Sequence, residues 1–229
     1  MNDFWSNRLI DALKRCYFFS DKIRVGKDFD GGYIIGRLPV KYDLLLSCGI
    51  LDDVSFENHF LELYPDTSSA FAFDGTIENL PIEAKDEITF IKKNIGFNPN
   101  NDTIFDKINS STNPFLKMDI EGAEWEWLEK IPLETLDNLK QICIEFHFIN
   151  NNRQVRALEK ISKTHYLVHI HGNNTDKCIF RNGFNIPRIL ECTYIHKDFF
   201  KNPSLSQESF PTDLDMPNVK GKLDIKLEF

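Results

Sequence analysis

Residues 114–131 read "PFLKMDIEGAEWEWLEKI", and this stretch changes character halfway along its length. The run at 114–120 is apolar enough for a buried strand, and the segment that follows has the apolar spacing of a helix. Three carboxylates, Asp119, Glu121 and Glu124, lie where the strand passes into the helix. A buried strand that continues into an amphipathic helix is the repeating unit of an α/β fold, so this stretch predicts that fold class.

The same alternation extends to both sides of this stretch. Further strands are predicted at 42–49, 69–75, 87–96, 141–149, 166–173 and 188–196. Helices are expected between the first five strands, and the segment 55–64 places Phe56, Phe60 and Leu63 on one helical face. Strands joined by crossover helices indicate a doubly wound, seven-stranded α/β sheet.

The length and the composition of the chain favour a single domain over residues 1–229. The chain is 41% hydrophobic, which is enough for one sizeable core. We expect residues 1–40 to form a leading helix and a ligand-contacting loop, residues 41–200 to form the core sheet, and residues 201–229 to wrap the surface as a tail. This tail is also the candidate contact surface of a homo-oligomer.

Composition and charge argue against several classes of protein. The net charge is -8 and Lys and Arg form no cluster, which argues against a nucleic-acid partner. No apolar run approaches the roughly 18 residues of a membrane span, and charges scattered through the N-terminus are unlike a secretory signal. We therefore expect a cytoplasmic protein. The cysteines are far apart and odd in number, which argues against a disulfide framework and a zinc knuckle: Cys16, Cys48, Cys143, Cys178 and Cys192.

Ligands of an open α/β sheet bind beyond the carboxyl ends of its strands. The first predicted strand ends at Gly49, which would let the backbone approach a ligand, and Asp52 and Asp53 follow it. The GxGxxG loop that holds a pyrophosphate is absent, which argues against a dinucleotide. Asp74 ends the second strand, either as an ordinary turn residue or as an acid that binds ribose hydroxyls. A ribose-binding acid without a phosphate loop points to S-adenosylmethionine, which has no phosphate.

The fourth and fifth predicted strands bring Asp119, Glu121, Glu145 and His147 to one mouth of the sheet. Because residues alternate faces along a strand, Asp119 and Glu121 share a face, as do Glu145 and His147. Two uses fit this cluster. One is a general base for a hydroxyl, and the other is a divalent cation held by Asp119, Glu121 and Glu145. The structural alternatives are a helix-capping Glu121, a core His147 and a solvated Glu124 in the first helical turn.

Residues 24–35, "RVGKDFDGGYII", precede the sheet. Gly31 and Gly32 permit a tight turn with positive φ, which a simple hairpin explains. Lys27 and Asp30 place charges around that turn, as a ligand-contacting loop requires. Both interpretations stay open.

In their order along the chain, these motifs resemble those of the FkbM-type S-adenosylmethionine-dependent methyltransferases. The segment "LKMDIEGAEWEWL" (116–128) is similar to the family's central signature, a Lys-x-Asp-x-Glu-Gly-x-Glu segment after the fourth strand. The resemblance extends over most of the chain, through "RVGKDFDGGYII", "SCGILDDVSFE", "AFDGT", "IEFHF", "HIHGNN" and "LDMPN". It implies a class I methyltransferase fold, a Rossmann-like sheet with an antiparallel seventh strand. "SCGILDD" departs from the family's more usual Gly-x-Gly form.

The resemblance also implies which residues contact each ligand. Asp74 would hold the ribose of the cofactor, 94–96 would flank its adenine, and Asp119 would lie below its methionine moiety. The expected cofactor contacts are Gly31, Gly32, Ser47, Cys48, Gly49, Asp52, Asp53, Ser55, Asp74, Gly75, Asn94, Ile95 and Asp119. The expected contacts to the acceptor are Lys27, Asp30, Lys117, Glu145, His171 and Asn173.

These observations predict an O-methyltransferase that acts on a hydroxyl of a small polar acceptor, a sugar or sugar nucleotide used for surface polysaccharide. His147 is expected to act as the base, with Asp119 and Glu121 as positioning groups or metal ligands. Three alternatives remain open. They are an enzyme for another small phosphorylated metabolite, a non-catalytic methyltransferase-like binding protein, and a nucleotide-dependent oxidoreductase.

Overall fold

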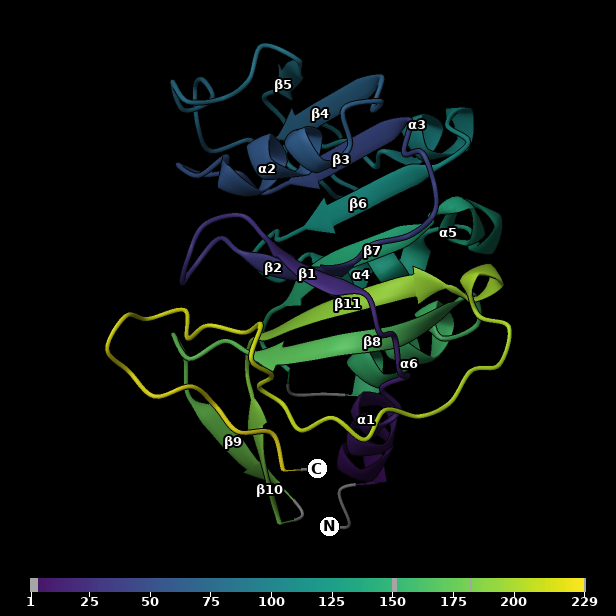
Figure 1. Ribbon diagram of the computed structural model, residues 1–229, viewed down its shortest axis with the longest axis vertical. Coiled ribbons are helices and arrows are strands. Elements are labelled where there is room, and N and C mark those ends of the chain that lie inside the picture. The colour runs from purple at the N-terminus through teal and green to yellow at the C-terminus, as the bar shows by residue number, and fades with distance from the viewer. Residues whose placement is uncertain (1–3, 150–151, 182, 229) are drawn as a thin grey trace.

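The computed structural model of the chain describes residues 4–149, 152–181 and 183–228. A seven-stranded sheet runs through it in the order β5-β4-β3-β6-β7-β11-β8 (Figure 1). Each of the seven predicted strands is present, which confirms the α/β class. The strands are β3 (Leu44–Cys48), β4 (Ser69–Phe73), β5 (Ile88–Ile91), β6 (Pro114–Met118), β7 (Gln141–Phe146), β8 (His165–Gly172) and β11 (Leu190–His196).

The directions of the strands give the sheet its switch point. Neighbouring strands from β5 to β7 are parallel, whereas β11 is antiparallel to both β7 and β8, which confirms the antiparallel last strand. The chain fills one side of β3 with β4 and β5 and the other side with β6 and β7. The strand order therefore reverses between β3 and β6, where such sheets bind ligands.

Helices and a hairpin cover the two faces of the sheet. One apolar core is shared by α1 (Phe4–Lys14), α3 (Phe105–Ser110), α4 (Glu124–Lys130), α5 (Leu133–Asn138) and α6 (Asn152–Ile161). The opposite face is covered by α2 (Ser55–Leu63) and by the hairpin of β1 (Lys22–Val25) and β2 (Tyr33–Gly36). Burial on both faces explains why β3, β6 and β7 are apolar along their whole length. The predicted leading helix is α1.

The connections between strands differ from the prediction in two places. Residues 74–87, which join β4 to β5, contain no helix, so the prediction of helices between all of the first five strands was wrong. Asn58 of α2 holds this loop instead, because its side chain donates to the Glu83 carbonyl and accepts from the Lys85 N–H. After β8, the chain adds a hairpin of β9 (Cys178–Arg181) and β10 (Phe184–Pro187), which the sequence did not predict.

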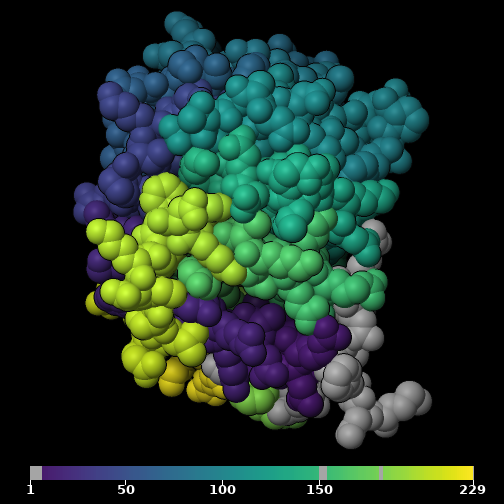
Figure 2. Space-filling view, turned by 90° about the vertical axis from the view of Figure 1, so that its right-hand side faces the viewer, coloured from purple at the N-terminus to yellow at the C-terminus, as the bar shows by residue number. Residues whose placement is uncertain are grey.

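After β11 and a short helix, η1 (Lys197–Phe199), the tail runs back along the molecule. It first meets the segment before β1, where the Phe18 N–H donates to the Ser204 carbonyl and the Ser206 N–H to the Cys16 carbonyl. Figure 2 shows this yellow-green part of the chain against the purple N-terminal segment. The chain's five cysteines are free thiols. Among the described residues, no helix is long and apolar enough to cross a bilayer.

Candidate active site

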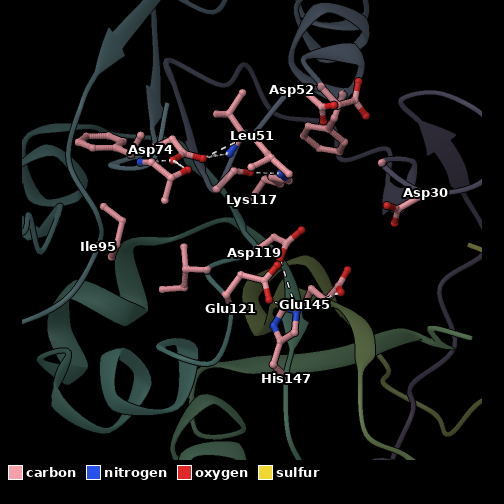
Figure 3. A pocket seen from close by; sticks show the side chains of 18 of the residues that line it. Asp30, Leu51, Asp52, Asp74, Ile95, Lys117, Asp119, Glu121, Glu145 and His147 are labelled. Carbon is pink, nitrogen blue, oxygen red and sulfur yellow. Dashed lines mark hydrogen bonds and ion pairs between the residues drawn. The ribbon is translucent and has the colours of Figure 1, made fainter. Parts of the chain in front are cut away.

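A cavity of about 700 Å³ opens at the carboxyl ends of the parallel strands, at the switch point (Figure 3). Residues that follow β3 and β4 line one half of it, and residues that follow β6, β7 and β8 line the other. Its volume lies within the range of about 300–1,000 Å³ that is typical of small-molecule sites. Position and size therefore make this cavity the candidate active site.

The turn after β3 is drawn tightly against β6. Gly49 has a φ of +82°, and a Cβ added there would lie 1.6 Å from the Asp119 carbonyl oxygen. Its N–H donates to the Phe73 carbonyl at 2.9 Å, and the Asp119 N–H donates to the Cys48 carbonyl at 2.8 Å. The sequence predicted that Gly49 admits a ligand. In the structure this glycine admits the backbone that follows the neighbouring strand, and it also lines the cavity, so the ligand contact stays a prediction.

Asp74 fixes the other side of the same turn. Its carboxylate accepts hydrogen bonds from the N–H groups of Ile50 (3.1 Å) and Leu51 (2.9 Å), and from the N–H (2.7 Å) and hydroxyl (2.5 Å) of Thr76. Burial raises the pKa of Asp74, but these hydrogen bonds lower it below its ordinary value. An ionised carboxylate has about four acceptor sites, and the chain uses four. The predicted ribose contact requires some of these bonds to be exchanged, and it stays a prediction.

His147, the residue after β7, is held by a buried carboxylate. Its ring is almost fully buried, and Nδ1 lies 3.0 Å from Oε1 of Glu124, the first residue of α4. The same oxygen accepts from the N–H groups of Ile120 (3.0 Å) and Gly122 (3.2 Å). An oxygen that accepts from these amides also accepts from the ring, so Nδ1 carries the hydrogen. In the neutral imidazole, Nε2 then presents its lone pair to the cavity.

Three further carboxylates surround Nε2 of His147. Oε1 of Glu145 lies 3.4 Å away, Oε2 of Glu121 lies 3.5 Å away, and Oδ1 of Asp119 lies 3.8 Å away. Burial lowers the pKa of His147, but the hydrogen bond and charge of Glu124, with the charges of Asp119 and Glu121, raise it above its ordinary value. The carboxylates therefore favour a ring that takes up a proton at Nε2.

Tyr33 of β2 connects two of these carboxylates. Its hydroxyl lies 3.0 Å from Oδ2 of Asp119 and 3.3 Å from Oε2 of Glu145, and Asn173 donates to Glu145 at 3.2 Å. Burial and the charge of Asp119 raise the pKa of Glu145 well above its ordinary value. One hydroxyl donor therefore serves a pair of acids that are held close together in a buried place.

Lys117 lies beneath the cavity on β6. Its ammonium donates to the Gly49 carbonyl at 2.7 Å. Burial lowers the pKa of Lys117, but the charges of Glu57 and Asp119 raise it above its ordinary value. The ammonium therefore stays charged and ties β6 to the turn after β3.

A family model described as the methyltransferase FkbM domain matches residues 17–196. This match covers well over half of the chain and ends with the last residue of β11. The chain belongs to the FkbM methyltransferase family. The resemblance found in the sequence is thereby confirmed, and the tail lies outside the matched region.

The comparison with solved structures gives one further observation. This FkbM methyltransferase is similar to the precorrin-6y C5,15-methyltransferase of Geobacter metallireducens GS-15, with 12% sequence identity and a TM-score of 0.37. The similar region covers 70% of this chain and 83% of that one. No match was found among curated proteins.

Most of the site residues that the sequence predicted for this FkbM methyltransferase line the cavity. The expected catalytic residues His147, Asp119 and Glu121 all do so. The expected acceptor contacts that line it are Lys27, Asp30, Lys117, Glu145 and Asn173. The expected cofactor contacts that line it are Gly31, Gly49, Asp52, Asp53, Asp74, Asn94, Ile95 and Asp119.

Three side chains that were expected to contact the cofactor point away from the cavity. Ser47 is wholly buried in β3 and its hydroxyl donates to Glu57. Cys48 belongs to the apolar core on the α1 side of the sheet. The Ser55 hydroxyl accepts from the Lys27 N–H at 3.0 Å. These side chains do not line the cavity, because they are used to attach the strand and the hairpin to their neighbours.

Two glycines that were expected to contact the cofactor, and one histidine that was expected to contact the acceptor, also do not line the cavity. Gly32 is covered by the Lys27 carbonyl, and Gly75 by the Asn94 side chain, to which its N–H donates at 3.1 Å. His171 was expected to contact the acceptor. It is instead enclosed between β11 and the tail, where its side chain is only 1% exposed.

His171 joins the tail to β11 through its two ring nitrogens. Its Nδ1 lies 3.0 Å from Oε2 of Glu191, and its Nε2 lies 2.9 Å from Oδ1 of Asp224. Burial lowers the pKa of His171, but the hydrogen bonds to Asp224 and Glu191, with the charges of Glu191 and Asp215, raise it to about 10. The positive ring thus joins two carboxylates from different parts of the chain.

We expect the stability that His171 contributes through Glu191 and Asp224 to be lost at high pH. A histidine whose pKa is higher in the folded state stabilises fully below its unfolded value, and the effect disappears as pH rises through about 10. The difference in unfolding free energy between the wild-type protein and His171→Gln should therefore shrink by about 3 kcal/mol from neutral pH to about pH 10. Urea unfolding at both pH values measures this difference. Parallel pH profiles of the two proteins would contradict it.

Two residues of the site were not predicted in their observed roles. A solvated Glu124 was one structural alternative, but this residue is wholly buried and its carboxylate contacts His147 and two backbone N–H groups. The sequence signal is an acid directly before an inward-facing tryptophan. Tyr33 was not singled out in the sequence, and it reaches the acids because the β1–β2 hairpin folds across the sheet.

The residues that could hold a metal ion differ from the predicted ligands Asp119, Glu121 and Glu145. The Glu121 side chain is 82% exposed. Within the described residues, the donor atoms of Asp119, Glu145 and His147 lie within 4.8 Å of one another. A cation site at this place stays a prediction, and it would use the nitrogen that the base hypothesis also needs.

Proposed function

We propose that this FkbM methyltransferase transfers a methyl group from S-adenosylmethionine to a hydroxyl of a sugar used for surface polysaccharide. The observation that carries the proposal is the Glu124–His147 pair, which turns the Nε2 lone pair into the cavity beside the switch point. A base within reach of a bound hydroxyl is the group that O-methylation needs from the protein.

The chemistry of the lining fits the cofactor. Asp52 and Asp53 at the rim are suited to the cofactor's ammonium group, and Ile95 and Phe73 offer apolar surface to its adenine. The lining of the described chain contains no arginine, as expected for a cofactor without phosphates. When bound, S-adenosylmethionine supplies a methyl group that is already activated by its positive sulfur.

The residues around Nε2 then have separate tasks. With the cofactor bound, the acceptor oxygen would bond to the methyl carbon while the carbon–sulfur bond breaks, and the electron pair of that bond would stay on sulfur. Nε2 of His147 takes the hydroxyl proton, and Glu124 holds the ring and stabilises its positive charge. Asp119 and Glu121 lie close enough to Nε2 to orient the hydroxyl.

Calorimetric titration with S-adenosylhomocysteine tests the cofactor part of this proposal. We expect saturable binding to one site, because the cavity lies at the switch point and its charges suit the cofactor. Titration with NAD is the control and should give no heat of binding. Well-folded protein that binds NAD and not S-adenosylhomocysteine would overturn the proposal.

Removal of metal tests whether His147 acts as base or as ligand. We expect methyl transfer to survive treatment with EDTA, because the methyl donor needs no Lewis acid and Nε2 is used for the proton. The assay compares initial rates in untreated protein, after EDTA, and after EDTA followed by Mg²⁺ or Mn²⁺. Activity that EDTA abolishes and a divalent ion restores would assign Nε2 to a metal instead.

A further inference from the structure

The half of the cavity that receives the acceptor is lined by acids. Asp30 comes from the β1–β2 turn, Asp119 and Glu121 follow β6, and Glu145 is near the end of β7. Figure 3 shows Asp30 across the cavity from Glu121, with Asp119 and Glu145 between them. The four carboxylates thus face one space from both sides.

The cations near this space are already engaged. The Lys27 ammonium lies 3.0 Å from Oδ2 of Asp53, and the Lys117 ammonium donates to the Gly49 carbonyl at 2.7 Å. Nδ1 of His147 is bound to Glu124. In the described part of the chain, the lining offers an anionic acceptor no arginine and no uncommitted lysine. A phosphate or carboxylate would therefore meet the charges of Asp30, Asp119 and Glu121 without a free lysine or arginine to offset them.

Two of these acids, Asp30 and Glu145, are held by hydrogen bonds from other parts of the chain. Asn218 of the tail donates to Oδ1 of Asp30 at 3.2 Å and to Oε1 of Glu191 at 2.6 Å. Glu145 is buried, with hydrogen bonds from Tyr33 and Asn173. The tail and β7 thus support the two ends of one acidic subsite.

Nε2 of His147 points into the same subsite. It belongs to an almost fully buried ring and makes no hydrogen bond within the described residues, where its neighbours are the carboxylates of Glu145, Glu121 and Asp119 at 3.4, 3.5 and 3.8 Å. A ligand in the subsite is therefore expected to offer a hydroxyl to this nitrogen and positive charge to the acids around it.

We propose that the acceptor is an amino sugar, whose ammonium group is bound by Asp30 and Glu145 while a neighbouring hydroxyl meets Nε2 of His147. This inference rests on the proposed function and narrows its acceptor class. It excludes sugar nucleotides and sugar phosphates, which the sequence had left open.

Transfer of labelled methyl groups to three matched compounds tests the inference: glucosamine, N-acetylglucosamine and glucosamine 6-phosphate. The first is cationic, the second has the same ring without the charge, and the third adds an anion. We expect kcat/KM to fall about 10- to 100-fold from the first to the second, because a charge-assisted hydrogen bond is lost. The third should react more slowly still.

Substitution of Asp30 tests the same inference, and substitution of Asp28 is its matched control. Asp30→Asn should reduce the preference for glucosamine over N-acetylglucosamine and leave the affinity for S-adenosylhomocysteine unchanged. Asp28→Asn removes the same charge from an exposed position of the same turn outside the lining, and it should change neither. A preference that survives Asp30→Asn would overturn the assignment.

The outcomes separate this inference from the proposed function. Equal or faster transfer to N-acetylglucosamine or glucosamine 6-phosphate, with or without added Mg²⁺, overturns the amino-sugar acceptor and leaves the methyltransferase intact. Binding of S-adenosylhomocysteine without transfer to any of the three compounds overturns the amino-sugar acceptor as well. Absence of S-adenosylhomocysteine binding overturns the proposed function itself.

Discussion

His147→Ala should lower kcat for methyl transfer by about 10²- to 10⁴-fold, the usual contribution of a positioned general base. Nε2 is directed into the cavity by the bond from Nδ1 to Glu124, and no other imidazole lines the cavity in the described chain. The affinity for S-adenosylhomocysteine should not change, because His147 lies in the part of the cavity that we propose for the acceptor. Initial rates and calorimetric titration of the same preparation measure both quantities.

Glu124→Gln separates the position of the ring from its chemistry. Glutamine keeps the shape of the side chain but removes the charge that raises the pKa of His147. We expect the acidic limb of the pH–rate profile to move to lower pH, because the ring of the variant loses its proton more easily. The control is Glu126→Gln, in the same helical turn, where the carboxylate pairs with Lys130 on the surface. An unchanged profile in Glu124→Gln, or equal kcat in His147→Ala and wild type, would remove His147 from the mechanism.

The parts of the fold that follow from local pattern were predictable. Buried strands such as β3 and β6 are apolar along their whole length, and the amphipathic spacing of α2 marks it as a helix. Asp119 and His147 were found because strand ends in such a sheet converge on one edge. The loop between β4 and β5 was missed because it is fixed by Asn58 of a different element, which no local pattern records.

The errors in the site have a common physical cause. Glu124 is buried where α4 packs against β7, His171 is enclosed by a tail that returns from more than 50 residues away, and Tyr33 lies on a hairpin that folds across the sheet. Each position depends on packing between segments that are distant in sequence. Periodicity tells which side of an element is apolar, but not which polar neighbour covers an acid or a histidine.

Gly49→Ala should disrupt both folding and cofactor binding. The new Cβ would lie 1.6 Å from the Asp119 carbonyl oxygen, so β3 and β6 cannot keep their spacing at the switch point. We expect a loss of at least about 4 kcal/mol in unfolding free energy, which is exceptional for a single methyl group. Turn residues 50–53 would shift away from Asp74, so any folded fraction should fail to bind S-adenosylhomocysteine.

Gly221→Ala isolates the effect of backbone conformation from that of the clash. Gly221 has a φ of +85°, close to the +82° of Gly49, but a Cβ there would have no neighbour within 4 Å. A left-handed alanine costs about 1–2 kcal/mol by itself, so the remainder of the Gly49→Ala effect measures the contact between β3 and β6. Urea unfolding and titration with S-adenosylhomocysteine apply to both variants. Equal destabilisation by the two substitutions, with cofactor binding retained, would show that this contact does not shape the cavity.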